Sequence, residues 1–409
     1  MRILHTADWH LGNLFYGHDR MVEHRHFLNW LLDTLRQQLP DVLIISGNVF
    51  DSANPSAGAE QLLYDFLMEA VEAVRGLQIV MISGNRDSAG RLEASAQLLK
   101  RHNIYVRGSV KSTDDGKIDF DNLILPLSSR LYSDAEMVCL AVPYLRANDY
   151  PAGMTLNEGL QYYFENIMRK LKKSEFRKLP VVAAAHFYMS GTEVGDMERR
   201  EWSVMGGQEC IRPDAVGPGL SYVALGHLHR GQRVDSGVTE MYYAGCALPM
   251  SFAEGKLQHG VEMVDIGGDG HVHQIQRMPY EPLRQLMTIP QEGGTTAKEV
   301  FDAIGELPRR KKNECGDDWP YLEIRLQAQQ ADPNFLHEVN VALMDRSVHF
   351  CHVVRVWGEK PLGGIPTSSL KTQKALDPLE MAKTIFDARY HEEMPKELVI
   401  RFKEADQNR

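Results

Sequence analysis

Five short apolar runs of this chain are each followed at once by residue types that bind metal ions. The first run, Ile3-Leu4, leads into Thr6-Ala7-Asp8-Trp9-His10-Leu11-Gly12, in which a carboxylate and an imidazole stand two residues apart. At the end of a strand such a pair points to one side of the sheet and can bind one divalent cation from two directions. We therefore expect a metal site at a strand end. The four later fragments are Gly47-Asn48-Val49-Phe50-Asp51, Gly84-Asn85-Arg86-Asp87, Ala185-His186-Phe187 and Gly226-His227-Leu228-His229.

The first 110 residues alternate predicted strands with predicted helices. Apolar residues recur at helical spacing over residues 20–38 and 56–75, whereas residues 2–6, 42–45 and 79–82 are predicted strands. Open α/β sheets bind ligands at the carboxyl ends of their strands, where the polar fragments lie. From about residue 118 to 280 the chain is richer in strands, with one helix over about 155–173. Strands are predicted there over residues 138–142, 181–184, 222–225, 241–243 and 261–264.

The segment from Pro279 to Pro290 is a predicted domain boundary. After it, strands over residues 286–289, 321–326 and 349–357 alternate with helices near 296–306 and 333–345, which predicts a smaller α/β unit. The stretch from Pro361 to Ser369 is typical of a flexible linker. Two short amphipathic helices follow, the first starting at Asp377-Pro378. The predicted organisation is a first domain over 1–280, a second over 281–358, a linker over 359–376 and a helical module over 377–409.

Two features of the second half indicate partners. Arg309, Arg310, Lys311 and Lys312 form a basic run, which is either a solvated loop or a patch that contacts DNA phosphates. The two helices after the linker are too short to form a core of their own, so they either dock on a partner protein or pack on their own body. Docking is favoured, and the residues expected to make it are Leu379, Ile385, Phe386, Leu398 and Phe402.

Composition limits the remaining functions. A net charge of -10 argues against a surface that is basic overall, so any contact with nucleic acid must come from a local patch. No apolar run approaches the roughly 18 residues that a membrane helix needs, and the N-terminus lacks the apolar core of a signal peptide. The five cysteines are scattered without C-x-x-C spacing, which predicts buried reduced thiols in a cytoplasmic protein.

The strand-end fragments together supply seven oxygen or nitrogen donors, and no cysteine joins them. Mixed imidazole and oxygen coordination suits Mn, Fe or Zn rather than a structural thiolate zinc site. Seven donors are too many for one ion and about right for two. Two neighbouring cations are the arrangement that activates water and holds both oxygens in phosphoester hydrolysis. The predicted ligands are Asp8, His10, Asn48, Asn85, His186, His227 and His229.

These fragments resemble, in order, the motifs of the calcineurin-like metallophosphoesterases: D-x-H, G-D-x-x-D, G-N-H-[DE], a strand-end His and G-H-x-H. The continuation into Glu23-His24, Tyr243-Ala244-Gly245 and Pro249-Met250-Ser251-Phe252 is similar to the bacterial SbcD family of nuclease subunits, over nearly the whole chain. The resemblance implies an α/β fold with a metallophosphoesterase β-sandwich flanked by helices, a smaller α/β cap domain for DNA recognition and a C-terminal helical pair.

The resemblance also implies a function. Members of the SbcD family are DNA exonucleases and endonucleases that use two Mn²⁺ per chain. With the ATPase SbcC they act on double-stranded DNA ends and hairpins in repair and recombination. They are homodimers, and a C-terminal helical module holds the coiled-coil base of the ATPase. By the same resemblance, Arg86 and Asp87 occupy catalytic positions, and Arg86 stands where the family has a catalytic His.

Two positions depart from the family pattern. Asn48 stands where the family has the Asp that bridges both metals. A neutral amide removes the negative charge between two dications, so the second metal should bind more weakly and manganese occupancy should fall. Arg86 replaces the His that assists the leaving group, and a guanidinium stays protonated in proteins and adds repulsion beside the metals. It could instead hold a DNA phosphate.

Three functions are compatible with these residues. The chain is an active nuclease that tolerates both changes, a catalytically disabled chain that keeps its DNA clamp and partner binding, or a general phosphodiesterase or phosphatase on the same core. The second domain and the helical tail disfavour the third. The other six predicted ligands are all present, although an abandoned site would have begun to lose them. This favours recent or engineered substitutions at Asn48 and Arg86 over an old inactive relative.

Overall fold

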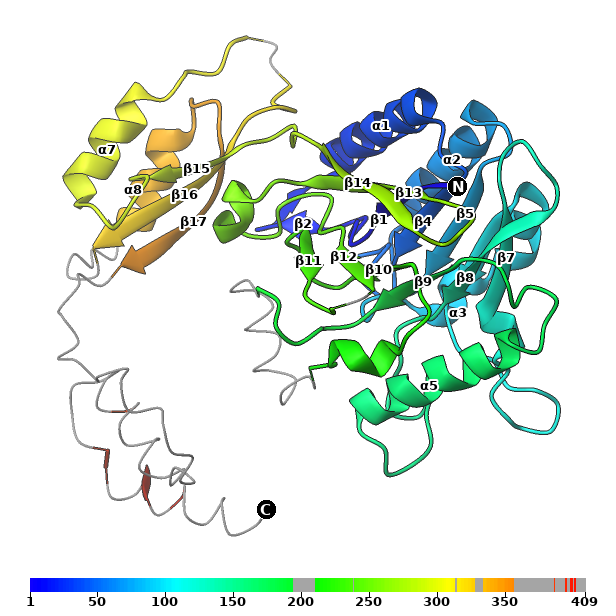
Figure 1. Cartoon of the computed structure of the whole chain (residues 1–409). Coiled ribbons are helices and arrows are strands. Elements are labelled where there is room, and N and C mark those ends of the chain that lie inside the picture. The colour runs from blue at the N-terminus through cyan, green and yellow to red at the C-terminus, as the bar shows by residue number, and fades with distance from the viewer. Residues whose placement is uncertain are drawn as a thin grey trace. The chain divides into compact units, whose positions relative to one another are not determined.

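The computed structural model of the chain describes residues 1–193, 210–237, 239–312, 315–327 and 334–356, with residues 386, 394, 395, 398, 399 and 401 nearer the C-terminus. The chain divides into two compact units, Met1–Val356 and Trp357–Arg409. The helices and strands whose bounds are given below belong to the first unit (Figure 1). Over the described ranges, no helix combines the length and apolar character needed to cross a membrane.

The first six-stranded sheet consists of β1 (Arg2–Thr6), β4 (Val42–Ser46), β5 (Gln78–Ile82), β6 (Ile104–Arg107), β13 (Gly260–Ile266) and β14 (Val272–Pro279). Its strand order is β14-β13-β1-β4-β5-β6. The four strands from β1 to β6 in this order are parallel, and β13 pairs antiparallel with β1. The carboxyl ends of the parallel strands therefore meet at one edge of the sheet.

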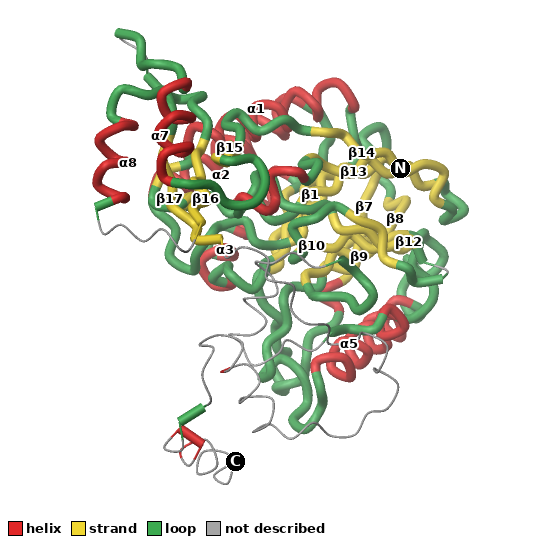
Figure 2. The backbone as a smooth tube through the Cα atoms, turned by 90° about the vertical axis from the view of Figure 1, so that its left-hand side faces the viewer, coloured by secondary structure: helices red, strands yellow, loops and turns green. Residues whose placement is uncertain are grey.

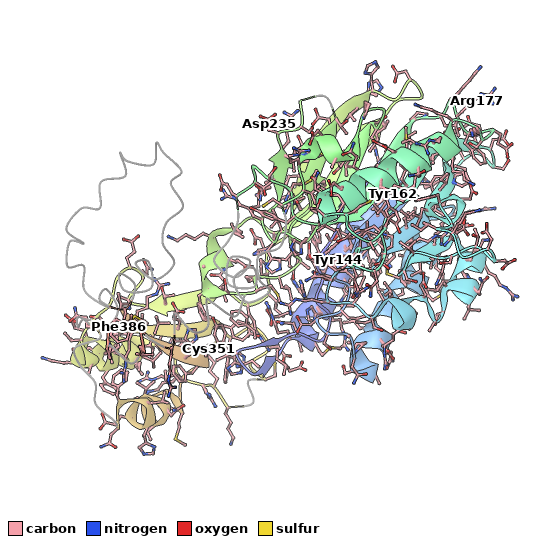
Figure 3. All side chains as sticks on the ribbon, turned by 90° about the horizontal axis from the view of Figure 1, so that it is seen from below. Tyr144, Tyr162, Arg177, Asp235, Cys351 and Phe386 are labelled. Atoms are coloured by element: carbon pink, nitrogen blue, oxygen red, sulfur yellow. The ribbon has the colours of Figure 1, made fainter. Side chains whose placement is uncertain are left out.

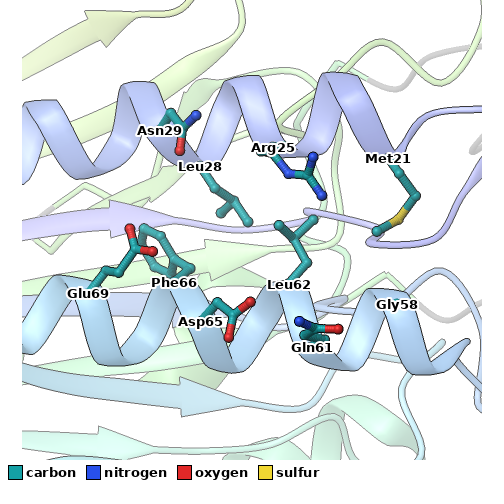
Figure 4. Close-up of a pocket in the computed structure, with 10 residues that line it drawn as sticks. All are labelled: Met21, Arg25, Leu28, Asn29, Gly58, Gln61, Leu62, Asp65, Phe66 and Glu69. Atoms are coloured by element: carbon teal, nitrogen blue, oxygen red, sulfur yellow. The ribbon is translucent and has the colours of Figure 1, made fainter.

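Two long helices, α1 (Met21–Gln38) and α2 (Ala57–Ala73), cover the outer face of this sheet (Figure 1). Their apolar faces form one core with the strands, in which Leu31 and Leu63 are fully buried. A groove runs between the two helices, lined by the apolar Leu62 and by the charged Arg25, Asp65 and Glu69 among others (Figure 4). The amphipathic spacing that predicted both helices is therefore a consequence of packing on the sheet.

The second six-stranded sheet consists of β7 (Ile124–Ser128), β8 (Ala135–Ala141), β9 (Val181–His186), β10 (Tyr222–Gly226), β11 (Gln232–Val234) and β12 (Glu240–Tyr243). Its order is β11-β12-β10-β9-β8-β7, with β8, β9, β10 and β12 parallel. The helix α5 (Leu156–Leu171) packs on its outer face and begins with a capping box between Thr155 and Glu158. This pair satisfies backbone N–H groups at the helix start.

The two sheets pack face to face and enclose a third core between them (Figure 2). The first sheet contributes branched side chains such as Ile44 and Val80, and the second contributes small ones such as Ala184 and Ala224. Small residues on one face let the sheets approach closely. The resulting order of layers is helix, sheet, sheet, helix, which confirms the predicted β-sandwich flanked by helices.

A smaller parallel sheet follows, with β15 (Leu286–Ile289), β16 (Tyr321–Gln327) and β17 (His349–Val356) in that order. Its helices α7 (Ala297–Glu306) and α8 (Phe335–Leu343) lie side by side and share one apolar core with the sheet (Figures 1 and 2). Phe301 and Phe335 join the two helices, with ring centroids 5.7 Å apart. The predicted strand and helix elements of this α/β unit are confirmed, and the domain boundaries stay predictions.

A buried polar network joins this smaller sheet to α1. Glu23 accepts hydrogen bonds from Arg20 Nη2 at 2.9 Å and from the Tyr321 hydroxyl at 2.6 Å. Arg284 Nη1 donates to the Tyr321 oxygen at 2.7 Å and lies 3.4 Å from Glu23. The side chains of Arg20 and Glu23 are fully buried, so two guanidinium groups and one carboxylate share a site closed to water.

Several elements were not predicted from the sequence. They include β6, β7, β11, β14 and the hairpin of β2 (Leu14–Phe15) and β3 (His18–Asp19). The short helices α3 (Ala89–Glu93) and α4 (Ala96–Leu99) and four 3₁₀ segments were also missed. All are brief or lie at sheet edges, where periodicity is weak. The 3₁₀ segments are η1 (Lys100–His102), η2 (Asp121–Leu123), η3 (Pro213–Val216) and η4 (Phe252–Lys256).

The cysteines and the tail differ in part from expectation. All five cysteines are free thiols, as predicted, and Cys139 and Cys246 are buried. Burial was wrongly predicted for the other three, because Cys315 is exposed and both Cys210 and Cys351, the latter labelled in Figure 3, are half-buried. The predicted linker 359–376 and the tail residues Leu379, Ile385 and Phe402 lie outside the described residues. In the second unit, Phe386 is half-buried and Leu398 is 43% exposed.

We predict that Glu23→Gln destabilises the protein by about 3 kcal/mol or more, because it leaves two buried guanidinium groups without their carboxylate. Asp33→Asn is the matched control, since Asp33 lies on the same helix and pairs with Arg36 on its exposed face. An exposed pair of this kind contributes little to stability. Urea unfolding followed by circular dichroism measures both variants, and equal unfolding midpoints would contradict the prediction.

Candidate metal centre

The seven predicted ligands lie in five loops that leave the carboxyl ends of strands in both sheets. Asp8 and His10 follow β1, Asn48 follows β4, and Asn85 follows β5. His186 ends β9, and His227 and His229 follow β10. All are buried except Asn85, which is half-buried. The fold therefore gathers residues from positions 8 to 229 at one place.

Four of the seven predicted ligands adopt positive φ angles, which non-glycine residues rarely do. The angles are 51° at Asp8, 49° at His10, 50° at Asn48 and 104° at His227. Backbone strain of this kind costs roughly 1–3 kcal/mol per residue and clusters at functional sites, where surrounding structure enforces it. A neighbouring glycine permits the arrangement at Asn48, because a Cβ at Gly84 would collide with Asn48.

Asp8, His10 and His229 form a first group that fits a divalent cation. Their candidate ligand atoms all lie within 4.8 Å of one another. His10 Nδ1 donates to Asp51 Oδ1 at 3.2 Å, so Nε2 is the free nitrogen, and it is buried without a hydrogen-bond partner. A buried acceptor without a partner in the protein indicates a position that an ion or a water molecule fills. His229 Nδ1 likewise faces Glu254 Oε1 at 3.3 Å.

Asn85, His186 and His227 form a second group. His186 Nδ1 donates to the Ser46 carbonyl at 2.8 Å, which leaves Nε2 as an acceptor, and this atom lies 3.1 Å from Asn85 Oδ1. With the amide in this orientation both atoms are acceptors, which suits them to bind one cation together. The rings of His186 and His227 are 5.3 Å apart. None of the three side chains of this group carries a negative charge.

The amide of Asn48 connects Asp8 to the loop after β5. Its Nδ2 donates to Asp8 Oδ1 at 3.0 Å, and its Oδ1 accepts the backbone N–H of Arg86 at 3.1 Å. The other oxygen of Asp8 accepts the backbone N–H of His227 at 2.8 Å. Asp8 therefore meets a hydrogen-bond donor from Asn48, where a carboxylate at the same position would present only acceptors.

Burial sets the protonation state of the histidines. Burial, with a smaller effect of His229, lowers the pKa of His227 to about 3. Burial also lowers the pKa of His10 and places that of His186 well below its usual value. The neutral imidazole is the form that binds a metal. Burial raises the pKa of Asp8 to about 7 although His229 opposes the shift, so the protein itself supplies little positive charge to this carboxyl group.

The two predicted catalytic residues lie in different surroundings. Arg86 is half-buried beside the site, with Nη1 3.8 Å from Asp51 Oδ1. Asp87 is buried and accepts backbone N–H groups from Gly84 at 2.8 Å and Phe50 at 2.9 Å. Asp87 therefore ties the loop after β4 to the loop after β5, and its catalytic role stays a prediction.

Three side chains that contact the predicted ligands were not assigned from the sequence. Asp51 orients His10, and its place in the G-D-x-x-D pattern was the signal for it. Glu254 contacts His229 from η4, and the sequence carries no signal for this contact. The ring of Tyr144, labelled in Figure 3, meets that of His186 edge-on at 6.3 Å. Its position directly after the strand β8 and Pro143 was a weak signal.

The basic run 309–312 lies in the connection between α7 and β16, far in sequence from the metal centre. Arg309 Nε is 3.5 Å from Asp345 Oδ2 and stays 75% exposed. Arg310 donates to the Arg346 carbonyl at 2.8 Å and stacks over Trp319 at 4.7 Å. Both arginines are therefore held by neighbours of the smaller sheet, and both interpretations of the run stay open.

Several known proteins are similar in sequence to this chain. The Calcineurin-like phosphoesterase family model matches residues 1–231, which include all seven predicted ligands. The D-type subunit of the nuclease SbcCD from Rhodobacter capsulatus is 36% identical over 355 residues, covering 84% of each chain. The corresponding Bacillus subtilis protein is 31% identical, covering 82% of this chain and 85% of its own, and the Escherichia coli K12 one is 29% identical, covering 71% and 70%. The chain therefore belongs to the calcineurin-like phosphoesterase family and, within it, to the SbcD family of nuclease subunits.

Proposed function

We propose that this chain is the D-type subunit of an ATP-dependent, SbcCD-like nuclease that acts on DNA ends and hairpins, and that its own hydrolytic activity is impaired. The observation that carries the proposal is the charge of the site. Asp8 is the only carboxylate among the seven predicted ligands, and Asn48 meets it with an N–H group. Membership of the family indicates that the site binds divalent metal ions, and we propose that the ion is Mn²⁺.

The residues present can hold such ions. Asp8, His10 and His229 would hold the first, and Asn85, His186 and His227, with the carbonyl of Asn48 after rotation of its amide, would hold the second. When bound, the pair of ions supplies an activated water and positive charge for phosphodiester hydrolysis. The protein orients the imidazoles for this role, because Asp51 and the Ser46 carbonyl each fix an Nδ1–H and leave Nε2 toward the site.

The impairment has two causes. Asn48 supplies no negative charge between the two ion positions, so mutual repulsion of two dications is offset only by Asp8. Arg86 stands at the predicted catalytic position with a group that stays protonated, so it cannot give a proton to a leaving alkoxide and take one back. The neighbouring Asp51 holds Nη1 of Arg86 at 3.8 Å, which keeps the guanidinium at the site.

A second candidate function is a non-catalytic subunit that holds DNA and its partner. Arg86 favours it, because a half-buried guanidinium beside the site can bind a backbone phosphate in a bidentate manner. The exposed Arg309 and its neighbours at 310–312 would add phosphate contacts on the smaller domain. In this function the chain forms a homodimer and binds an SbcC-type ATPase through its tail, while cleavage is absent.

We predict that the chain retains at most about one Mn²⁺ after dialysis, because only the group with Asp8 has a charged ligand. His229→Ala should remove this ion. His186→Ala is the matched control, since it removes an equally buried imidazole from the group that lacks charge and should change the retained manganese little. Elemental analysis of the dialysed proteins measures the content. Two tightly held ions per chain would refute the prediction.

We predict that Asn48→Asp together with Arg86→His restores Mn²⁺-dependent cleavage of DNA ends by at least about 10²-fold, the usual size of a general acid–base contribution. Either reversion alone should restore little, because the bridging carboxylate and the proton-handling imidazole act as one unit and their effects are non-additive.

Initial rates on a labelled duplex with the ATPase present measure all four chains. Asp8→Asn in the doubly reverted chain is the control, and it should abolish the restored cleavage. Full activity of the unchanged chain would show that Asn48 and Arg86 do not impair it.

We predict that truncation after about Leu370 leaves a folded protein that no longer co-purifies with an SbcC-type ATPase. Each apolar residue of the tail contributes on the order of 1.5–3 kcal/mol to docking if it becomes fully buried. Ile385→Asp with Phe386→Asp should have the same effect without truncation, whereas Lys383→Asp is a control for added negative charge at a polar position of the same predicted helix. Unchanged binding of the truncated chain would shift the docking site to the smaller domain.

A further inference from the structure

Glu254 lies on η4, outside all the predicted ligand loops, yet its carboxylate contacts a predicted metal ligand. Its Oε1 is 3.3 Å from His229 Nδ1, and the residue is 4% exposed. Its other oxygen accepts the backbone N–H of Met250 at 2.9 Å and lies 3.7 Å from Cys246 Sγ. Ser251 Oγ is 3.3 Å from Oε1. A carboxylate with this many fixed partners has one orientation.

The contact decides which nitrogen of His229 faces the metal site. An ionised carboxylate can only accept a hydrogen bond, so Nδ1 of His229 carries the hydrogen and donates it to Glu254. Nε2 of His229 then keeps its lone pair. Partners of this kind fix the ring and raise the basicity of a ligating histidine. The described structure gives His10 and His186 the same tautomer through Asp51 and the Ser46 carbonyl. Glu254 completes the pattern for His229.

The loop that carries Glu254 is held from the far side by Arg20. Arg20 Nη1 donates to the Pro249 carbonyl at 2.7 Å, and Pro249 directly precedes Met250, whose N–H binds Glu254. Arg20 itself is fixed by Glu23, which in turn accepts the hydroxyl of Tyr321 on β16. A continuous series of buried and partly buried hydrogen bonds therefore runs from the smaller sheet to His229.

We propose that Glu254 is a positioning residue for His229 and that, through Arg20 and the Pro249 carbonyl, it couples metal affinity at Asp8, His10 and His229 to the attachment of the three-stranded sheet. The inference rests on the proposed role of His229 as a metal ligand. It adds that a change at the smaller sheet, such as a DNA contact that displaces Tyr321, alters how tightly the first ion is held.

The test compares the Mn²⁺ dissociation constant of the unchanged chain, two single variants, their double variant and one control variant, measured by electron paramagnetic resonance of the free ion. Glu254→Gln should weaken binding about 10- to 100-fold, the range found for partners of ligating histidines. Tyr321→Phe should weaken it several-fold, since it removes only the distant hydroxyl. The double variant should lose less than the product of the two factors, because both changes act through one contact.

Glu262→Gln is the matched control. Glu262 is a buried carboxylate of similar exposure that pairs with Arg277 at 2.8 Å and touches no predicted ligand. In the absence of metal, Glu254→Gln and Glu262→Gln should lower the midpoint temperature of thermal unfolding to a similar extent. The affinity for Mn²⁺ should fall only in the Glu254→Gln chain. This separates positioning from a general structural effect.

Equal Mn²⁺ affinities of the Glu254→Gln and Glu262→Gln chains would overturn the positioning role. Factors for Glu254→Gln and Tyr321→Phe that simply multiply would overturn the coupling to the smaller sheet. Absence of saturable Mn²⁺ binding by the unchanged chain would overturn the metal assignment itself, and this inference with it. Failure of the inference and failure of the proposed function are thus distinguishable.

Discussion

The close approach of the two sheets at Ser46 supports the whole candidate site. Ser46 ends β4 in the first sheet, and its hydroxyl donates to the Ala224 carbonyl of β10 in the second sheet at 2.9 Å. Its own carbonyl accepts His186 Nδ1 at 2.8 Å. A Cβ at Gly226 would strike the same carbonyl, so only glycine permits this approach. Because the strands here are parallel within each sheet, this one contact brings five loops to a common point.

The predicted metal ligands of this chain carry little negative charge. The imidazoles His10, His186 and His227 are kept neutral by burial, which lowers their pKa values; this suits them to bind a cation but gives no attraction of opposite charge. Asp8 alone supplies that charge among the predicted ligands, and burial raises its pKa to about 7 while His229 opposes the shift. A second dication would meet an amide at Asn48. The predicted ligands thus number enough for two ions but carry one negative charge.

Much of the fold and the candidate ligand set could be predicted because both depend on local sequence. Strand β4 is a continuous apolar run, and α1 shows apolar residues at helical spacing, so each was predicted within a few residues. The predicted ligands follow strands directly, and parallel sheets place such residues together. The contacts that orient them could not be predicted in this way. Glu254 is separated from His229 by 25 residues, and Arg20 from Pro249 by 229, so only the folded chain brings them together.

We propose that Asn48 leaves this chain able to hold one metal ion tightly instead of a coupled pair of ions. Electron paramagnetic resonance of the protein with two equivalents of Mn²⁺ tests it directly, because two ions that share a bridging ligand are magnetically coupled. We expect the six-line spectrum of an isolated protein-bound Mn²⁺, with the second equivalent free in solution. A spin-coupled dimanganese signal that accounts for both equivalents would contradict it.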